Sequence, residues 1–210
     1  MSTMTDTLEH EEALFIPSEH TDAKDEYIPM VEGEYLGHIT GTRTLTREFT
    51  KEKRPMKARI FNFNVTIAPD NTHNEYTVHR HDTRKVVTGE HYVGKTVISD
   101  GVFRFLEPAE GDKFESNAAG NKRYLLFCQS LGMEIPTEER TINGKTVTVQ
   151  LLPDVKEDDL DGTPVNAVVG RGQDWVDDHG RTRPSWRVKF TKRWEDGKRL
   201  AATTTNDLPF

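Results

Sequence analysis

Apolar and polar residues alternate along short segments of this chain, and turn residues separate the segments. In residues 33–45 the apolar or small positions on one side are Tyr35, Gly37 and Ile39. In residues 59–68 four apolar side chains share one face: Phe61, Phe63, Val65 and Ile67. A similar texture continues through residues 75–108. Because successive strand residues point to opposite faces, the pattern predicts a series of short β-strands, each with one buried face.

One segment has helical spacing instead. In residues 121–133 the side chains of Tyr124, Leu125, Phe127, Cys128 and Leu131 recur at helical intervals, and Gly132 is placed to end the helix. Asn143-Gly144 predicts a tight hairpin, and further strands are expected in residues 163–176 and 184–196. There is no βαβ alternation and no fixed repeat. The fold class predicted is mainly β with one helix, an OB-fold-like small barrel (the oligonucleotide-binding type) with long loops and disordered termini.

Acidic residues are concentrated at the start of the chain. Residues 1–32 hold nine Asp or Glu and one Lys, whereas residues 33–210 hold 27 basic and 26 acidic side chains. The net charge of −7 therefore comes from the first segment and does not exclude binding of a polyanion elsewhere. We expect three parts: an acidic disordered segment (1–30), a barrel domain (31–200) and a flexible tail (201–210).

The composition also bounds the cellular setting. No apolar run approaches the ~20 residues that span a bilayer, and residues 1–14 lack the basic and apolar regions of a secretory signal. Cys128 is the single cysteine, so an intramolecular disulfide is excluded. These features favour the reducing cytoplasm and predict no membrane partner.

A first basic cluster spans residues 43–59, with seven bases against Glu48 and Glu52. It lies between the first two predicted strands, where OB folds place a loop that reaches nucleic acid. A solvated basic loop without a binding role fits the composition equally well. The candidate nucleic-acid-binding residues of this cluster are Arg47, Lys51, Lys53, Arg54 and Lys57.

A second basic cluster spans residues 181–199, with eight bases against Glu195 and Asp196. Strand alternation would place Trp186, Val188, Phe190 and Trp194 on one face and Arg187, Lys189 and Arg193 on the other. Proteins hold single strands in basic grooves and stack bases on aromatic rings, each stack contributing ~1–3 kcal/mol. The alternative is that the aromatic face belongs to the core. The candidate binding residues here are Trp186, Arg187, Lys189, Phe190, Arg193 and Trp194.

Residues 89–96, GEHYVGKT, match the pattern of a phosphate-binding loop. In such a loop Lys95 would reach the phosphates of a nucleotide and Thr96 would hold magnesium. The mechanism also requires a helix that begins at the loop, whereas the residues that follow are β-branched and broken by a turn. The context of a true phosphate-binding loop is therefore missing.

Other signals of chemistry are weaker. His79 and His81 lie on one strand face, but no cysteine pair or carboxylate at ligand spacing accompanies them. Residues 157–162, EDDLDG, imitate the start of a calcium loop, but the twelfth position is Val168, so an acidic loop is expected. Cys128 lies on the apolar face of the predicted helix, where inert packing is expected. We expect no metal, no cofactor and no enzymatic activity.

The last residues, NDLPF at 206–210, resemble the acidic and apolar C-terminal peptide of single-stranded DNA-binding proteins of bacteria and phages. The layout of the body is similar to that of phage proteins encoded beside replication and recombination functions: EGEY at 32–35, LGM at 131–133 and NGK at 143–145. The family's tails usually carry several acids, whereas this tail carries one. The resemblance implies an OB fold and implies that partner proteins bind Asp207, Leu208, Pro209 and Phe210.

Together these observations favour a non-enzymatic, phage-type single-stranded DNA-binding protein with little sequence preference, acting in the (host) cytoplasm. It would protect exposed strands and recruit replication or recombination proteins through its tail. Two alternatives remain: a protein-interaction or virion-associated β domain, and a nucleotide hydrolase that uses Gly89–Thr96. The sequence leaves open whether copies of the chain associate into a homo-oligomer and whether DNA is preferred to RNA.

Overall fold

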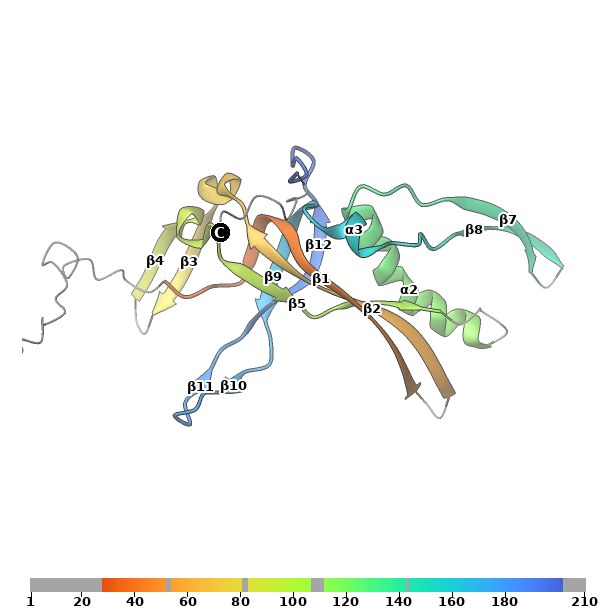
Figure 1. The fold of residues 1–210 in the computed structure, drawn as a ribbon, viewed down its shortest axis with the longest axis horizontal. Coiled ribbons are helices and arrows are strands. Elements are labelled where there is room, and N and C mark those ends of the chain that lie inside the picture. Colours follow the sequence, from red (N-terminus) through yellow and green to blue (C-terminus); the bar gives the residue numbers. More distant parts are fainter. Residues whose placement is uncertain (1–27, 52–53, 81–82, 107–111, 143, 202–210) are drawn as a thin grey trace, which may run out of the picture.

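The centre of the molecule is a five-stranded β-barrel (Figure 1). The computed structural model describes residues 28–201 apart from 52–53, 81–82, 107–111 and 143. The strands follow one another around the barrel in the order β1, β9, β12, β5 and β2, and β1 also pairs with β2, so the barrel closes. All neighbours are antiparallel except β5 and β12, which are parallel. The barrel strands are β1 (Gly33–Lys51), β2 (Arg54–Ile67), β5 (Thr96–Ser99), β9 (Pro164–Arg171) and β12 (Trp186–Arg193).

This architecture confirms the predicted OB-fold-like small barrel, mainly β with one substantial helix. The inward faces follow the predicted alternation, since Tyr35, Ile39, Phe61 and Val65 are all buried in the core. Gly37 is required where β1 crosses β2, because a Cβ atom there would lie 2.6 Å from the carbonyl oxygen of Thr66. The period-2 pattern of the sequence therefore identifies the barrel interior correctly.

Helix α2 (Asp112–Ser130) covers one end of the barrel. Its Tyr124 ring stacks on Phe61, with centroids 5.5 Å apart, and its Phe127 ring stacks on Phe63 at 5.3 Å. The helix ends as predicted at Gly132, which has a φ of 77°. The amides of Gly132 and Met133 bond back to the carbonyls of Gln129 and Cys128, the pattern that satisfies the last turn of a helix.

Smaller elements project from the barrel. In hairpin β7–β8 the last pair is Ile142 with Lys145, and Gly144 has a φ of 76°, as expected for the predicted hairpin. Residues 157–162 were expected to form an acidic loop, but Glu157–Leu160 form the short helix α3. None of the helices in the described ranges is long and apolar enough to cross a membrane. The other elements are η1 (Pro69–His73), β3 (Glu75–Arg80), β4 (Thr83–Thr88), η2 (Gly89–Tyr92), β6 (Val102–Phe105), β7 (Thr137–Ile142), β8 (Lys145–Gln150), β10 (Trp175–Val176) and β11 (Thr182–Arg183).

The predicted loop over residues 43–59 is wrong, because residues 43–51 belong to β1 and residues 54–59 belong to β2. The two strands pair without interruption from Arg43↔Asn62 to Lys51↔Arg54 and form a ribbon that extends beyond the barrel. The physical reason is composition: residues 44–50, TLTREFT, are rich in threonine and include phenylalanine, and both favour a pleated strand. The first basic cluster is therefore carried by a β-ribbon.

Residues before the predicted start of the barrel domain at residue 31 already contact the barrel. Ile28 is already buried, and the Tyr92 hydroxyl donates a hydrogen bond to the Pro29 carbonyl at 3.1 Å. Among the described residues, packing against the barrel therefore includes positions as far as three residues before the expected limit at 31. The expectations for residues 1–27 and for the tail 202–210 lie outside the described residues.

Candidate nucleic-acid interface

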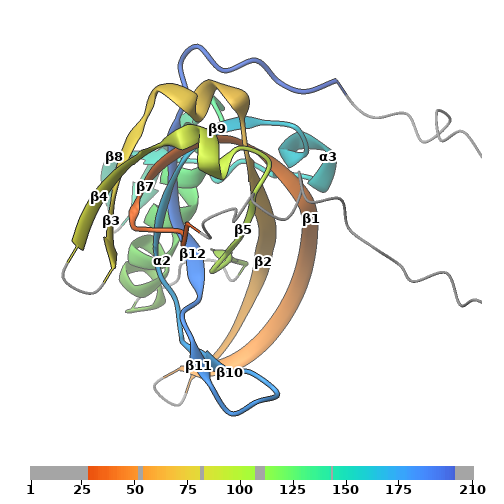
Figure 2. The same ribbon diagram turned by 90° about the vertical axis from the view of Figure 1, so that its left-hand side faces the viewer.

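Two arms project from the same side of the barrel. One is the β1–β2 ribbon, and the other is the two-stranded β10–β11 arm, which interrupts the connection between β9 and β12 (Figures 1 and 2). Between the arms lies the outer face of β5, with β2 on one side and β12 on the other. We call this outer face the saddle and define it by four outward side chains: Arg43, Asn64, Ile98 and Arg187.

The saddle combines an apolar centre with two arginines that are not paired with any carboxylate of the described residues. Asn64 pairs with Ile98 across β2 and β5, and Ile98 pairs with Arg187 across β5 and β12, so the three residues form one row. Ile98 is 50% exposed, which is unusual for an isoleucine at the middle of a sheet. The Arg187 side chain lies over Gly172, where a Cβ atom would be 2.6 Å from Cγ of Arg187. Among the described side chains, no carboxylate pairs with Arg43 or Arg187.

In the second basic cluster, strand β12 departs from the regular alternation of inward and outward side chains that the sequence predicts. The pairing of β12 with β9 shifts between Val188 and Phe190, which marks a β-bulge at this point. Val188 and Thr191 are buried, while Phe190 is 54% exposed. The predicted common face for Val188 and Phe190 is therefore wrong, because the extra residue of the bulge turns Phe190 outward.

The remaining candidates of this cluster divide between core and surface. Trp186 packs against the hydrophobic core, and Trp194 is half-buried with its ring 5.5 Å from that of His38. Lys189 is exposed and bonds Asp100 at 2.8 Å, and exposed Arg193 bonds Glu195 at 3.1 Å. The structure thus brings Arg187, Lys189 and Phe190 to the surface, whereas Trp186 and Trp194 are mainly structural.

The first basic cluster is only partly described. Arg47 is exposed, and none of the described carboxylates pairs with it; Lys57 is exposed and lies 3.4 Å from Glu48. The side chains of Lys51 and Arg54, and all of Lys53, fall outside the described residues. The structure places Arg43 and Arg47 of this cluster on β1 of the ribbon, where both side chains are exposed.

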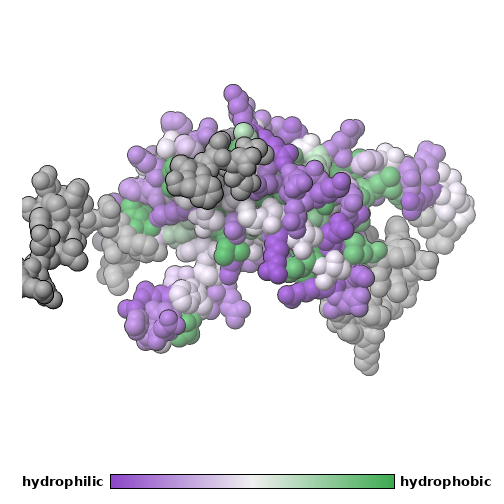
Figure 3. All heavy atoms as spheres, in the orientation of Figure 1, coloured by the Kyte–Doolittle hydropathy of each residue, from purple (hydrophilic) through white to green (hydrophobic). Residues whose placement is uncertain are grey.

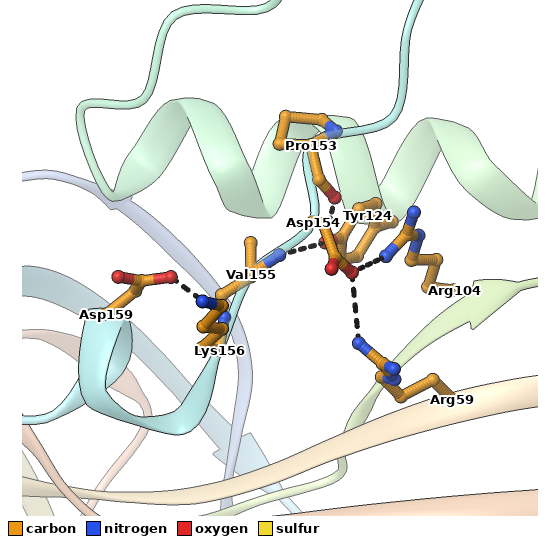
Figure 4. Close-up of polar contacts among 8 residues, drawn as sticks. All are labelled: Arg59, Arg104, Tyr124, Pro153, Asp154, Val155, Lys156 and Asp159. Carbon is orange, nitrogen blue, oxygen red and sulfur yellow. Dashed lines mark hydrogen bonds and ion pairs between the residues drawn. The ribbon is translucent and has the colours of Figure 1, made fainter.

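Two other arginines contact the segment that follows β8. We call this segment, residues 153–155, the strut. The carboxylate of Asp154 lies between the guanidinium groups of Arg59 and Arg104 (Figure 4), with 3.0 Å to Arg59. Hydrogen bonding from Arg104 is the main cause that lowers the pKa of Asp154. The Tyr124 hydroxyl donates to the Pro153 carbonyl at 2.6 Å and accepts from the amide of Val155 at 3.4 Å, which ties the strut to α2. Both guanidinium groups are therefore engaged by Asp154, whose single negative charge offsets one of their two positive charges.

The sequence analysis missed one prominent aromatic residue. Trp175 on the β10–β11 arm is 55% exposed, and its neighbour Val176 is also exposed. Hydrophilic residues cover most of the face in Figure 3, with small apolar patches on the barrel and on the arm. The signal was present: Trp175 and Val176 lie between GRGQD and DDHG, turn-rich segments that leave a strand too short to reach the core.

Residues 89–96 contribute to the core instead of forming a phosphate-binding loop. Tyr92 is fully buried and packs edge-on against Tyr35 and Tyr76. The Lys95 amine donates to the Ile28 carbonyl at 3.3 Å and lies over the Tyr92 ring. Strand β5 begins at Thr96, so the predicted strand is confirmed and the helix that such a loop needs does not follow it.

Cys128 is buried against the barrel, as expected for inert packing. Burial raises the pKa of its thiol to about 11, so the thiolate is a minor species near neutral pH. Within the described ranges, no group of three or more His, Cys, Asp or Glu side chains is arranged to hold a metal ion.

Comparison of the chain with protein-family models, with curated proteins and with solved structures gave no significant match. The interface is therefore described from the saddle, the two arms and their side chains.

Gly89 provides a test of the structural role of residues 89–96. A Cβ atom at Gly89 would lie 1.9 Å from the carbonyl oxygen of Asn71, a buried residue whose Oδ1 accepts a bond from the Leu36 amide. We expect Gly89→Ala to lower the free energy of unfolding by about 3 kcal/mol, measured by urea denaturation. The control is Gly144→Ala, which meets no atom and costs about 1 kcal/mol because φ is 76°. Equal, small losses in both variants would contradict the packing described for η2.

Proposed function

We propose that this protein binds single-stranded DNA non-enzymatically and with little sequence preference. The observation that carries the proposal is the saddle: an outer barrel face on which exposed Ile98 lies beside Arg187, with Arg43 on β1 across β2, flanked by two projecting arms. OB folds bind oligonucleotides on this face, between the corresponding connections. The phosphates would lie along Arg43, Arg47 and Arg187, and affinity would fall with salt as counterions are released.

Bases would contact the exposed apolar side chains on either side of the saddle. Trp175 on the arm and Phe190 on β12 are each more than half exposed, so their rings are free to stack on bases. Such stacking tolerates any sequence because every base has a π-face. Ile98, between them, would contact the DNA strand through apolar surface alone, without a hydrogen bond that selects one base.

The tail NDLPF completes the proposal through its resemblance to the C-terminal peptides of single-stranded DNA-binding proteins. In this proposal Asp207, Leu208, Pro209 and Phe210 bind replication or recombination proteins, and the barrel holds the strand. The two tasks would be separable because the saddle is made by residues 43–187 and the peptide by the last five residues.

A fluorescence-anisotropy titration with labelled oligo-dT tests DNA binding. If about four phosphates are neutralised, doubling the salt concentration lowers affinity about sevenfold. Trp175→Ala should weaken binding by about 5- to 100-fold, the loss of one base stack. The matched control is Lys145→Ala, an exposed basic residue on β8 in a separate hairpin, which should change affinity little. Absent or salt-independent binding overturns the proposal, and equal effects of both variants overturn the saddle as its site.

Deletion of residues 206–210 tests the role of the tail. We expect oligo-dT affinity to stay the same or to increase, because the deleted segment contributes an acid and no base. Capture of replication or recombination proteins by the immobilised chain should be lost, while a deletion of Thr203–Thr205 that keeps NDLPF should retain it. Loss of DNA binding on removal of 206–210 would show that the tail is not a separate docking peptide.

A further inference from the structure

A large apolar groove lies beside the saddle. It is formed by the second half of β12, the C-terminal half of α2 and the turn from β5 to β6, and its volume is about 1170 Å³. Phe63, Phe127 and Val188 contribute buried surface to it. Three large side chains along the groove stay open to solvent: Phe103 is 38% exposed, and Leu126 and Phe190 are each 54% exposed. This amount of exposed apolar surface around one concavity marks a binding groove.

The groove exists because β12 continues beyond the end of its parallel neighbour, β5. Strand β5 pairs only with Arg187 and Val188, and the chain then turns at Asp100–Gly101 into β6. From Lys189 to Arg193, no strand of the described chain pairs with the edge of β12 opposite β9. A strand edge next to apolar pockets is the arrangement that binds an extended peptide, through backbone hydrogen bonds and alternate side chains.

The rim of the groove is basic. Arg123, Lys189, Lys192 and Arg193 line it, against the single acid Asp100. Three of these bases have carboxylate neighbours, whereas none of the described carboxylates pairs with exposed Arg123. The occupant that fits is therefore a peptide with large apolar side chains flanked by acids.

Such a peptide is present in the chain itself. Residues 13–17, ALFIP, form an apolar run in the acidic segment, with Glu11 and Glu12 before it and Glu19 after it. Pro17 and Ile28 are eleven positions apart, which is enough extended chain to span about 36 Å. Ile28 is anchored to Lys95, and Lys95 is five residues from Asp100 at the groove, about 17 Å along β5. The peptide can therefore reach the groove in the same molecule, at a high effective concentration.

We propose that the groove binds residues 11–17 of the same chain, with Leu14 and Phe15 in its apolar part and Glu11 and Glu12 near the basic rim. The tether makes this an intrachain contact that needs no second copy. A consequence that rests on the proposed function is competition, because Lys189 and Phe190 belong both to the groove and to the candidate DNA surface. The acidic segment would then leave the groove when a DNA strand occupies the saddle.

Photocrosslinking in the full-length chain tests the contact without DNA. Phe15 is replaced by p-benzoylphenylalanine, which keeps an aromatic side chain, and the adducts are located by mass spectrometry. We expect intrachain adducts in residues 120–130 or 188–193. Introducing Leu126→Glu should abolish the adduct, because Leu126 lies on the groove at an exposed position and the new carboxylate opposes the acidic peptide. A Lys145→Glu control, outside the groove, should leave the adduct unchanged.

Four outcomes overturn the proposed contact. Adducts outside the groove, no adducts, or adducts that join two copies would exclude an intrachain groove contact. The same holds if the probe placed at Phe210 crosslinks to the groove and the probe at Phe15 does not, since the tail would then be the occupant. Oligo-dT affinity, measured separately, should increase in Leu14→Ala/Phe15→Ala. Crosslinks in the groove without any DNA binding would retain the peptide site and reject the proposed function.

Discussion

The parallel contact between β5 and β12 is the constraint on which the rest of the structure depends. Only two residue pairs make it, Arg187↔Ile98 and Val188↔Ser99, yet it is the pairing that joins the two halves of the barrel. Beyond Val188 the strands separate, and α2 packs against their inner side: Phe127 stacks on Phe63, and the hydroxyl groups of Ser130 and Thr191 lie 2.5 Å apart. Side-chain contacts from the helix therefore cover the inner face of β12, while its backbone edge from Lys189 to Arg193 lines the groove.

The same short contact between β5 and β12 also determines which side chains lie on the outer surface of the barrel. In the row that it forms, Ile98 and Arg187 face outward, and directly beyond it the bulge turns Phe190 to solvent. Asp100 and Lys189, which form an ion pair at 2.8 Å, directly follow Ser99 and Val188 and line the groove. Phosphate-binding arginines and a peptide-binding groove would thus be neighbours for a structural reason, the early end of β5. In the proposed account, a strand of DNA and an acidic segment of the chain compete where these two surfaces meet.

The spacing of apolar residues predicted the features that depend on one face of a single strand or helix. The inward residues of β1 and β2, the helix that carries Tyr124 and Phe127, and the turn at Gly144 follow from spacing alone. The bulge in β12 could not be found in this way, because a single inserted residue shows in the pairing with β9 and leaves the composition unchanged. Spacing did not distinguish the ribbon from a loop, because basic residues interrupt the apolar pattern in residues 43–59, although a paired strand tolerates exposed charges. Trp175 was overlooked because burial, and not residue type, separates a stacking ring from a core ring.

The most direct test of the central claim is to locate the DNA strand on the protein. Photocrosslinking of an oligo-dT that contains 5-iododeoxyuridine, followed by mass spectrometry, identifies the residues in contact with bases. Adducts at Trp175 and in the segments 96–103 and 186–190, on both sides of the β5–β12 contact, are the result that the account predicts. Adducts confined to the β3–β4 or β7–β8 hairpins, with none on the saddle or the β10–β11 arm, would contradict it.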